Sequence, residues 1–299
     1  AQPLNDSYVC FFAPYSVSAL MADDLPTLLY LPLRARAEAL RLMFAYAQIP
    51  FRDVVVSLED WPSLKPTMPP GPGAEFPGRE KGNRALPVLR FSKSEMLPES
   101  REIAQWIATR AGPPLLPSDA ALAQEAKDFF DKSQSLPGFW PTVLLIRFPE
   151  PAAEKIMRGE HLGDARFSDP NQTPIQSWYE GQPKFEDIKD LLLGLERILE
   201  QRSGTFFGGE QPHYGELGIF VQVDALVTLF GKKAALNGFS AKFRAWYGAL
   251  SALPVVDVYK RIRPLQQGYP NSIIMNHLKP EDRRTAGSEA ARFWAASRL

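Results

Sequence analysis

The 299-residue chain is poor in the residues that build redox and metal centres. It has one cysteine, Cys10, and three histidines. A single cysteine excludes an internal disulfide, a CxxC redox motif and a thiolate metal cluster. His161 and His277 are isolated, and no pair of histidines with carboxylates has metal-ligand spacing. No metal cofactor is therefore expected, and any thiol chemistry needs a thiol from a second molecule.

Long apolar runs and net charge are also missing. No stretch of about 18 apolar residues occurs, so no membrane-spanning helix is expected. Lys plus Arg and Asp plus Glu both number 34, and this balance creates no long-range field toward nucleic acid or an anionic membrane. Because 45% of the residues are hydrophobic, the chain can bury a sizeable core as one or two globular domains.

Apolar periodicity predicts an α/β first half. Ser100 is the expected N-cap of its second helix, and the proline-rich stretch 66–84 predicts a long loop. The predicted strands are 27–30, 51–58 and 86–91, and the predicted helices are 34–48 and 100–111.

The second half reads as entirely helical. A proline-rich linker at 112–119 precedes it, and a polar loop at 161–182 interrupts it. The predicted helices are 120–136, 183–202, 217–230, 241–252, 255–262 and a short one at 288–298.

Several motifs appear in a fixed order along the chain. Tyr30 begins the motif Tyr-x-x-x-Arg-x-Arg-Ala-Glu, which ends at Glu38. The others are Asp60-Trp61-Pro62-Ser63-Leu64-Lys65-Pro66, Leu86-Pro87-Val88-Leu89, Glu99-Ser100, Phe206-Phe207-Gly208-Gly209-Glu210 and His213-Tyr214-Gly215-Glu216. Together they resemble the signatures of the cytosolic glutathione transferases, in particular the tyrosine-type sigma, mu, pi and alpha classes.

The resemblance implies a fold and an assembly. The expected architecture is an α/β thioredoxin-like domain at 27–111, the linker at 112–119 and an all-α domain at 120–264. Extensions at 1–26 and 265–299 flank the domains. The resemblance also implies a homodimer and a cytoplasmic detoxification enzyme, and an organelle reached after removal of a targeting segment is the second expectation.

The resemblance assigns the thiol chemistry to Tyr30. Glutathione is the expected co-substrate, and its thiol is mostly protonated at neutral pH because free thiols have a pKa of about 8.5. A hydroxyl that donates a hydrogen bond to sulfur favours the thiolate, which is the nucleophile. Tyr30 would supply this bond, with Arg34 supporting the hydroxyl. The simpler alternative is that Tyr30 is an ordinary core aromatic.

The resemblance also implies a glutathione-binding set. A cis peptide bond before Pro87 would expose the backbone of Leu86, with which glutathione would pair like a strand. Ser100 would bind the α-carboxylate of the γ-glutamyl group at a helix N-terminus, and Glu99 would bind its ammonium. Trp61 and Lys65 resemble the pair that meets the glycine carboxylate, and a surface tryptophan packed on a lysine stem is the alternative.

Some positions depart from the family pattern. Pro32 and Ala35 replace a polar residue and a glycine, and Ala85 stands where a glutamine usually contacts glutathione. Residues 72–84 form an insertion that could cover the tripeptide site. These departures favour a second hypothesis, a weakly active or inactive subunit that docks on a larger assembly through its extensions. His213 and Glu216 are expected to form a structural capping box.

Overall fold

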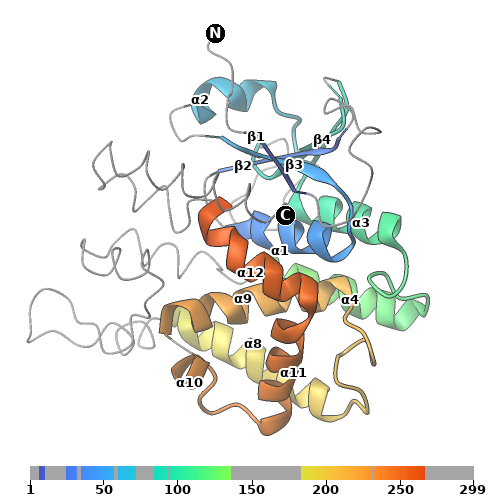
Figure 1. The fold of residues 1–299 in the computed structure, drawn as a ribbon, viewed down its shortest axis with the longest axis vertical. Helices are drawn as coiled ribbons and strands as arrows, with labels where there is room; N and C mark the ends of the chain where they lie inside the picture. The colour runs from blue at the N-terminus through green and yellow to red at the C-terminus, as the bar shows by residue number, and fades with distance from the viewer. Residues whose placement is uncertain are drawn as a thin grey trace, which may run out of the picture.

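The computed structural model describes residues 7–10, 25–31, 35–56, 60–71, 84–92, 94–135, 183–230 and 232–266. These residues form an α/β domain built on one sheet and a second domain made of helices (Figure 1). This is the predicted thioredoxin-like architecture followed by an all-α domain. The boundaries that the sequence suggests for the linker and the two extensions stay predictions.

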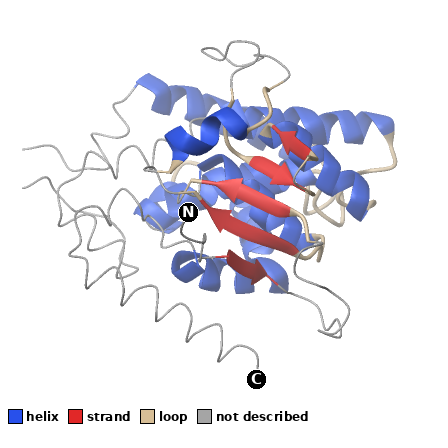
Figure 2. Ribbon diagram, turned by 90° about the horizontal axis from the view of Figure 1, so that it is seen from above, coloured by secondary structure: helices blue, strands red, loops and turns tan. Residues whose placement is uncertain are grey.

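In the described residues the sheet has five strands in the order β1-β3-β2-β4-β5. Figure 2 shows the strands side by side. Strands β2 and β3 are parallel and every other neighbouring pair is antiparallel. A parallel pair needs a long crossover, and the helix between β2 and β3 provides it. The strands are β1 (Ser7–Cys10), β2 (Thr27–Tyr30), β3 (Phe51–Val55), β4 (Val88–Arg90) and β5 (Met96–Pro98).

Three helices and one helical turn belong to the α/β domain. They are α1 (Ala35–Tyr46), α2 (Trp61–Leu64), the 3-10 turn η3 (Lys65–Thr67) and α3 (Ser100–Ala111). Ten of the twelve residues of α1 are buried, because α1 lies between the sheet and the helices α9 and α12 of the second domain. Tyr30, the residue that the sequence predicts to be catalytic, therefore lies at the edge of a densely packed core.

The helical domain is arranged around α9. Its described helices are α4 (Ala120–Ser135), α8 (Pro183–Glu200), α9 (Tyr214–Phe230), α10 (Lys232–Ala235), α11 (Ala241–Ala252) and α12 (Pro254–Gln266). Helix α9 is buried over most of its length and contacts α4, α10, α11 and α1. None of the helices in the described ranges is both long and apolar enough to cross a membrane.

Two glycines allow α4 and α9 to pack closely. A Cβ atom on Gly215 would lie 2.1 Å from the carbonyl oxygen of Ala126, and one on Gly218 would lie 2.5 Å from the Oγ atom of Ser133. Both distances are too short for real atoms, so larger residues would push the two helices apart.

The structure corrects one expectation about the first domain. Ser100 is the first residue of α3 and not its N-cap. Glu99 holds the N-cap position, with φ 72° and ψ 126°, and its side chain caps no backbone amide. The short elements β5 and α2 were not predicted, and β1 comes from the segment predicted to be an extension. The predicted loop 161–182, the helix 288–298 and residues 72–83 of the insertion lie outside the described residues.

Candidate functional site

Three of the expected site residues lie at the same end of the sheet. Leu29 of β2 pairs with Val88 of β4, and Val88 pairs with Pro98 of β5. Tyr30 directly follows Leu29, Pro87 directly precedes Val88 and Glu99 directly follows Pro98, so each is the next residue beyond this paired row. Residues separated along the chain by dozens of positions therefore meet at the same end of three neighbouring strands.

Tyr30 is the last residue of β2 and is 2% exposed. The backbone N–H of Arg36, in the first turn of α1, donates a hydrogen bond of 3.2 Å to the hydroxyl oxygen of Tyr30. This contact uses a lone pair of the oxygen and leaves the orientation of the hydrogen to other partners. The amides of the first helical turn carry the positive end of the helix dipole, so the phenol oxygen lies in an electropositive environment.

The chain turns sharply between Tyr30 and α1. Ala35, which replaces the usual glycine of the resembling motif, has φ 32°. This value lies in the left-handed region, where a side chain costs energy. Ala35 is also 6% exposed. Ala35 therefore has a backbone conformation that a glycine would adopt without strain.

Leu86 and Pro87 have the geometry expected for them. The peptide bond between them is cis, and Leu86 is 7% exposed. Leu86 lies two residues before Val88, the first paired residue of β4, so its backbone lies before the start of the ladder with β2.

Glu99 and Ser100 lie where β5 turns into α3. Glu99 adopts φ 72°, in the region where non-glycine residues are rare. Ser100 is 1% exposed and is the first residue of α3. A helix N-terminus favours a bound carboxylate, and the strained turn sets the direction in which Glu99 leaves the sheet.

The remaining expected site residues are Trp61, Lys65 and Arg34. Trp61 is half-buried and packs against the hydrophobic core, whereas Lys65 is exposed. The backbone N–H of Lys65 donates to the carbonyl oxygen of Trp61, so the two residues are one helical turn apart. Arg34 lies outside the described residues.

Two arginines near Tyr30 were given no role from the sequence. Arg36 contributes the amide that reaches the Tyr30 hydroxyl. Arg41 of α1 is 1% exposed and forms an ion pair of 2.8 Å with Asp53 of β3. Burial alone would lower the pKa of Arg41, but Asp53, Tyr259 and Glu38 together outweigh it and the pKa is raised. The signal for Arg41 was present in the sequence, because Arg41 follows Ala37 by four residues on the predicted buried face of its helix.

His213 and Glu216 form the expected capping box at the start of α9. The N–H of Glu216 donates to Nδ1 of His213 at 3.2 Å, and the N–H of His213 donates to Oε2 of Glu216 at 3.1 Å. The same carboxylate accepts from the N–H of Phe207 at 2.9 Å, from the N–H of Gly208 at 3.0 Å and from Nε1 of Trp246 at 2.9 Å. Both capping residues are fully buried, and their role is structural.

Glu125 of α4 lies behind this capping box. Its Oε1 atom is 3.9 Å from Nε2 of His213, and its Oε2 atom pairs with Arg202. Burial raises the pKa of Glu125, but His213 and Arg202 outweigh it, so the pKa stays below its usual value.

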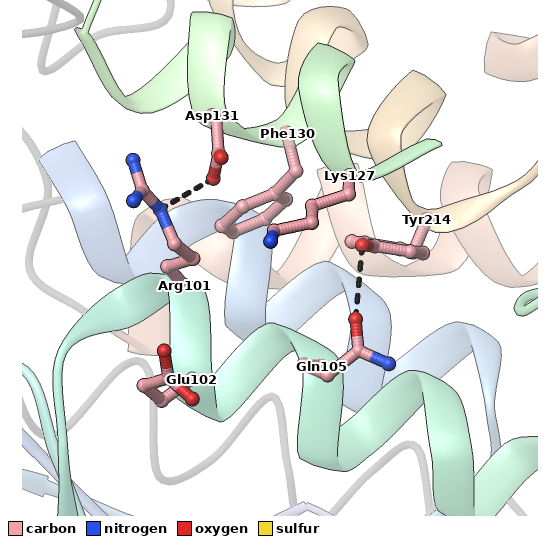
Figure 3. Close-up of a pocket in the computed structure, with 7 residues that line it drawn as sticks. All are labelled: Arg101, Glu102, Gln105, Lys127, Phe130, Asp131 and Tyr214. Atoms are coloured by element: carbon pink, nitrogen blue, oxygen red, sulfur yellow. Dashed lines mark hydrogen bonds and ion pairs between the residues drawn. The ribbon is translucent and has the colours of Figure 1, made fainter. Parts of the chain in front are cut away.

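A pocket of about 150 Å³ opens between α3, α4 and the start of α9 (Figure 3). Arg101 of α3 and Asp131 of α4 form an ion pair of 2.6 Å there, and Gln105 accepts a hydrogen bond of 3.2 Å from the Tyr214 hydroxyl. Burial raises the pKa of Tyr214, as does the charge of Asp131. None of the expected site residues lines this pocket; its walls are Arg101, Glu102, Gln105, Lys127, Phe130, Asp131 and Tyr214.

Known proteins match parts of the sequence. The chain is 36% identical over 85 residues to glutathione S-transferase 4 of Caenorhabditis elegans, which covers 28% of this chain and 34% of that protein. It is 42% identical over 67 residues to glutathione S-transferase S1 of Drosophila melanogaster, which covers 22% of this chain and 26% of that protein. The chain thus spans about a third or less of the length of these curated relatives. No protein-family model matches the chain.

Solved structures match most of the fold. The glutathione S-transferase from Ascaris lumbricoides covers 80% of this chain and 98% of its own, with a TM-score of 0.54 and 20% identity. A Nu-class glutathione transferase from Haemonchus contortus covers 80% and 97%, with a TM-score of 0.53 and 17% identity. Identities this low support the fold alone. The chain therefore has the fold of the cytosolic glutathione transferases, and a part of its sequence is similar to curated members of that superfamily.

Proposed function

We propose that the chain is a glutathione transferase of the tyrosine type. Tyr30 donates a hydrogen bond to the sulfur of glutathione, which favours the thiolate over the thiol. The thiolate then attacks an electrophilic carbon and forms a thioether, and the leaving group departs with the electron pair of the broken bond. Arg34 supports the hydroxyl in this scheme.

Glutathione binds along the end of the sheet in this proposal. The backbone of Leu86, before Pro87, pairs with the extended tripeptide, as in strand addition. Ser100 and Glu99 bind the carboxylate and ammonium of the γ-glutamyl group. Trp61 and Lys65 bind the glycine carboxylate at the other end.

The observation that carries the proposal is that Tyr30, Pro87 and Glu99 lie at the same end of three neighbouring strands. The pairing of Leu29 with Val88 and of Val88 with Pro98 sets the register of these strands. A buried phenol at a helix N-terminus, a cis peptide bond beside it and a buried serine opening α3 supply three different contacts for one extended ligand. An ordinary core tyrosine would need none of these neighbours.

The electrophile is expected to bind between the two domains, near α4 and the segment after α12. A homodimer and a cytoplasmic location follow from the same family resemblance and are parts of the proposal. The curated relatives named glutathione S-transferases support the substrate class.

The test is binding of glutathione and conjugation of a generic aryl halide. Tyr30→Phe is expected to lower kcat by about tenfold or more, the effect of one unit of thiol pKa on the thiolate fraction at neutral pH, while glutathione still binds. Tyr247→Phe is the matched control. It removes another buried hydroxyl, which donates to Asp224 in the helical domain, and it should leave kcat unchanged.

Two results would refute the proposal. One is absence of binding at millimolar glutathione by the wild-type protein. The other is an equal loss of kcat in Tyr30→Phe and Tyr247→Phe, because the loss would then reflect stability and not the thiol.

A further inference from the structure

Two opposite charges are buried beside Tyr30. Arg41 is 1% exposed and Asp53 is 6% exposed. The Nε atom of Arg41 donates to Oδ2 of Asp53 at 2.8 Å, and its Nη2 atom donates to Oδ1 at 3.2 Å. Two parallel bonds of this kind fix the plane of a guanidinium, so Asp53 holds Arg41 in one orientation.

In that orientation the guanidinium faces the ring of Tyr30. Its central carbon is 5.8 Å from the ring centroid, which is within the distance at which a cation is attracted to an aromatic ring. The parallel register pairs Leu28 with Asp53. Side chains alternate between the faces of a strand, so Tyr30 lies on the same face of the sheet as Leu28 and Asp53. Arg41 reaches both residues from α1, which covers that face.

A positive charge close to a phenol favours the ionised form of its hydroxyl. Burial strengthens the effect, because charges interact more strongly in a protein interior than in water. A phenol that ionises more easily is also a stronger hydrogen-bond donor. The interaction therefore acts on the property of Tyr30 that thiol activation needs.

We propose that Arg41 is a positioning residue for the reaction: its guanidinium, held over the Tyr30 ring by Asp53, makes the Tyr30 hydroxyl a stronger hydrogen-bond donor to the glutathione thiolate. This inference rests on the proposed function for its catalytic consequence. Its effect on Tyr30 itself does not depend on glutathione.

Other charged or titratable groups surround Arg41. Asp53 faces it from β3, Glu38 from its own helix α1, and Tyr259 from α12. Arg36 reaches the Tyr30 hydroxyl from the first turn of α1. Asp53 opposes the effect of Arg41 on Tyr30 because it carries the opposite charge. Removing Asp53 alone should therefore ease ionisation of Tyr30, whereas removing Arg41 should hinder it.

The experiment compares variants of two buried ion pairs. Arg41→Met combined with Asp53→Asn removes both charges of the ion pair next to Tyr30, so that neither partner is left as an unpaired buried charge, which is strongly destabilising. The matched control is Lys260→Met combined with Asp224→Asn. It neutralises a pair of 2.8 Å whose aspartate is 2% exposed, in the helical domain.

The first measurement is an ultraviolet titration of the Tyr30 hydroxyl without glutathione. Each protein is compared with the same protein carrying Tyr30→Phe, so that the difference isolates one tyrosine. The Arg41→Met/Asp53→Asn variant should titrate about one unit higher than wild type, the lower end of the effect of a close opposite charge. Arg41→Lys should shift the midpoint less, because it keeps a cation, and Asp53→Asn should shift it in the opposite direction.

The second measurement is the pH profile of conjugation. The Arg41→Met/Asp53→Asn variant should lose kcat at neutral pH by less than about tenfold, because one unit of the Tyr30 pKa corresponds to tenfold and the hydrogen bond passes on only part of this change to the thiol, with the KM for glutathione little changed. An unchanged Tyr30 midpoint in this variant would overturn the inference, as would an equal shift in the Lys260→Met/Asp224→Asn control. A shifted midpoint in a protein that does not conjugate would confirm the inference about Tyr30 and refute only the proposed function.

Discussion

Replacing Glu216 with glutamine tests how much the buried capping box stabilises the helical domain. Each oxygen of the carboxylate accepts two hydrogen bonds, from Phe207 and Trp246 at Oε1 and from Gly208 and His213 at Oε2. Glutamine keeps one oxygen and places an N–H donor where the other oxygen was. Two of the four donors then lose their acceptor and face another donor.

The magnitude follows from the number of bonds lost. A hydrogen bond to a charged group contributes about 1.5 kcal/mol, so two lost bonds lower the free energy of unfolding by about 3 kcal/mol. Domains of ordinary stability unfold at a cost of about 5–15 kcal/mol. Glu216→Gln should therefore remain folded in buffer but unfold at a clearly lower urea concentration.

The assay is urea unfolding followed by tryptophan fluorescence and by circular dichroism. Glu210→Gln is the control, since it makes the same chemical change at an exposed residue of the neighbouring loop and should not move the midpoint. If both variants unfold at the wild-type urea concentration, the carboxylate does not hold the loop 206–213 to α9 and α11 and the reasoning is wrong.

Three further predictions concern stability. Gly215→Ala should lower the free energy of unfolding by about 2 kcal/mol or more, because its Cβ atom would overlap α4. Gly248→Ala has no atom in its way and should stabilise α11 by about 0.8 kcal/mol. Thermal unfolding should therefore show a lower midpoint for the first variant and a higher midpoint for the second. Glu99→Gly should remove the strain of the positive φ and stabilise the protein by about 1 kcal/mol, while calorimetry should detect weaker glutathione binding. The control Glu102→Gly, in the first turn of α3, should destabilise the protein instead. Glu125→Gln should lower stability at pH 7, and this difference should vanish as the pH falls below about 4.3, because the pKa of Glu125 is lowered in the folded state; a difference that persists in acid would contradict this.

The long amphipathic helices could be predicted from the sequence alone. Helices α1, α3, α4, α8 and α11 lie within two residues of their predicted bounds, because their apolar residues recur with the period of a helix that buries one face. Short helices and strands could not be predicted from apolar periodicity. Three residues at Met96–Pro98 cannot establish a period, and β5 is a strand only because β4 pairs with it.

The sequence also did not predict the charged residues inside the core. Arg41 and Asp53 are twelve residues apart, and their ion pair exists because β3 returns parallel to β2 beneath α1. In sequence, a lone arginine on an apolar helix face has no visible partner. Helix α9 begins at Tyr214, three residues before its predicted start at residue 217, although the capping box of His213 and Glu216 was itself predicted.

The sequence by itself determined the order of the long helices, the family resemblance and the identity of the expected site residues. These depend on local periodicity and on short motifs such as Tyr30 to Glu38. The tertiary structure decided which residues meet. Strand pairing brings Tyr30, Pro87 and Glu99 to the same end of the sheet, helix packing brings Arg41 over the Tyr30 ring, and the turn before α3 makes Glu99 its N-cap. Pairing and packing join residues that are distant along the chain, and no local pattern carries that information.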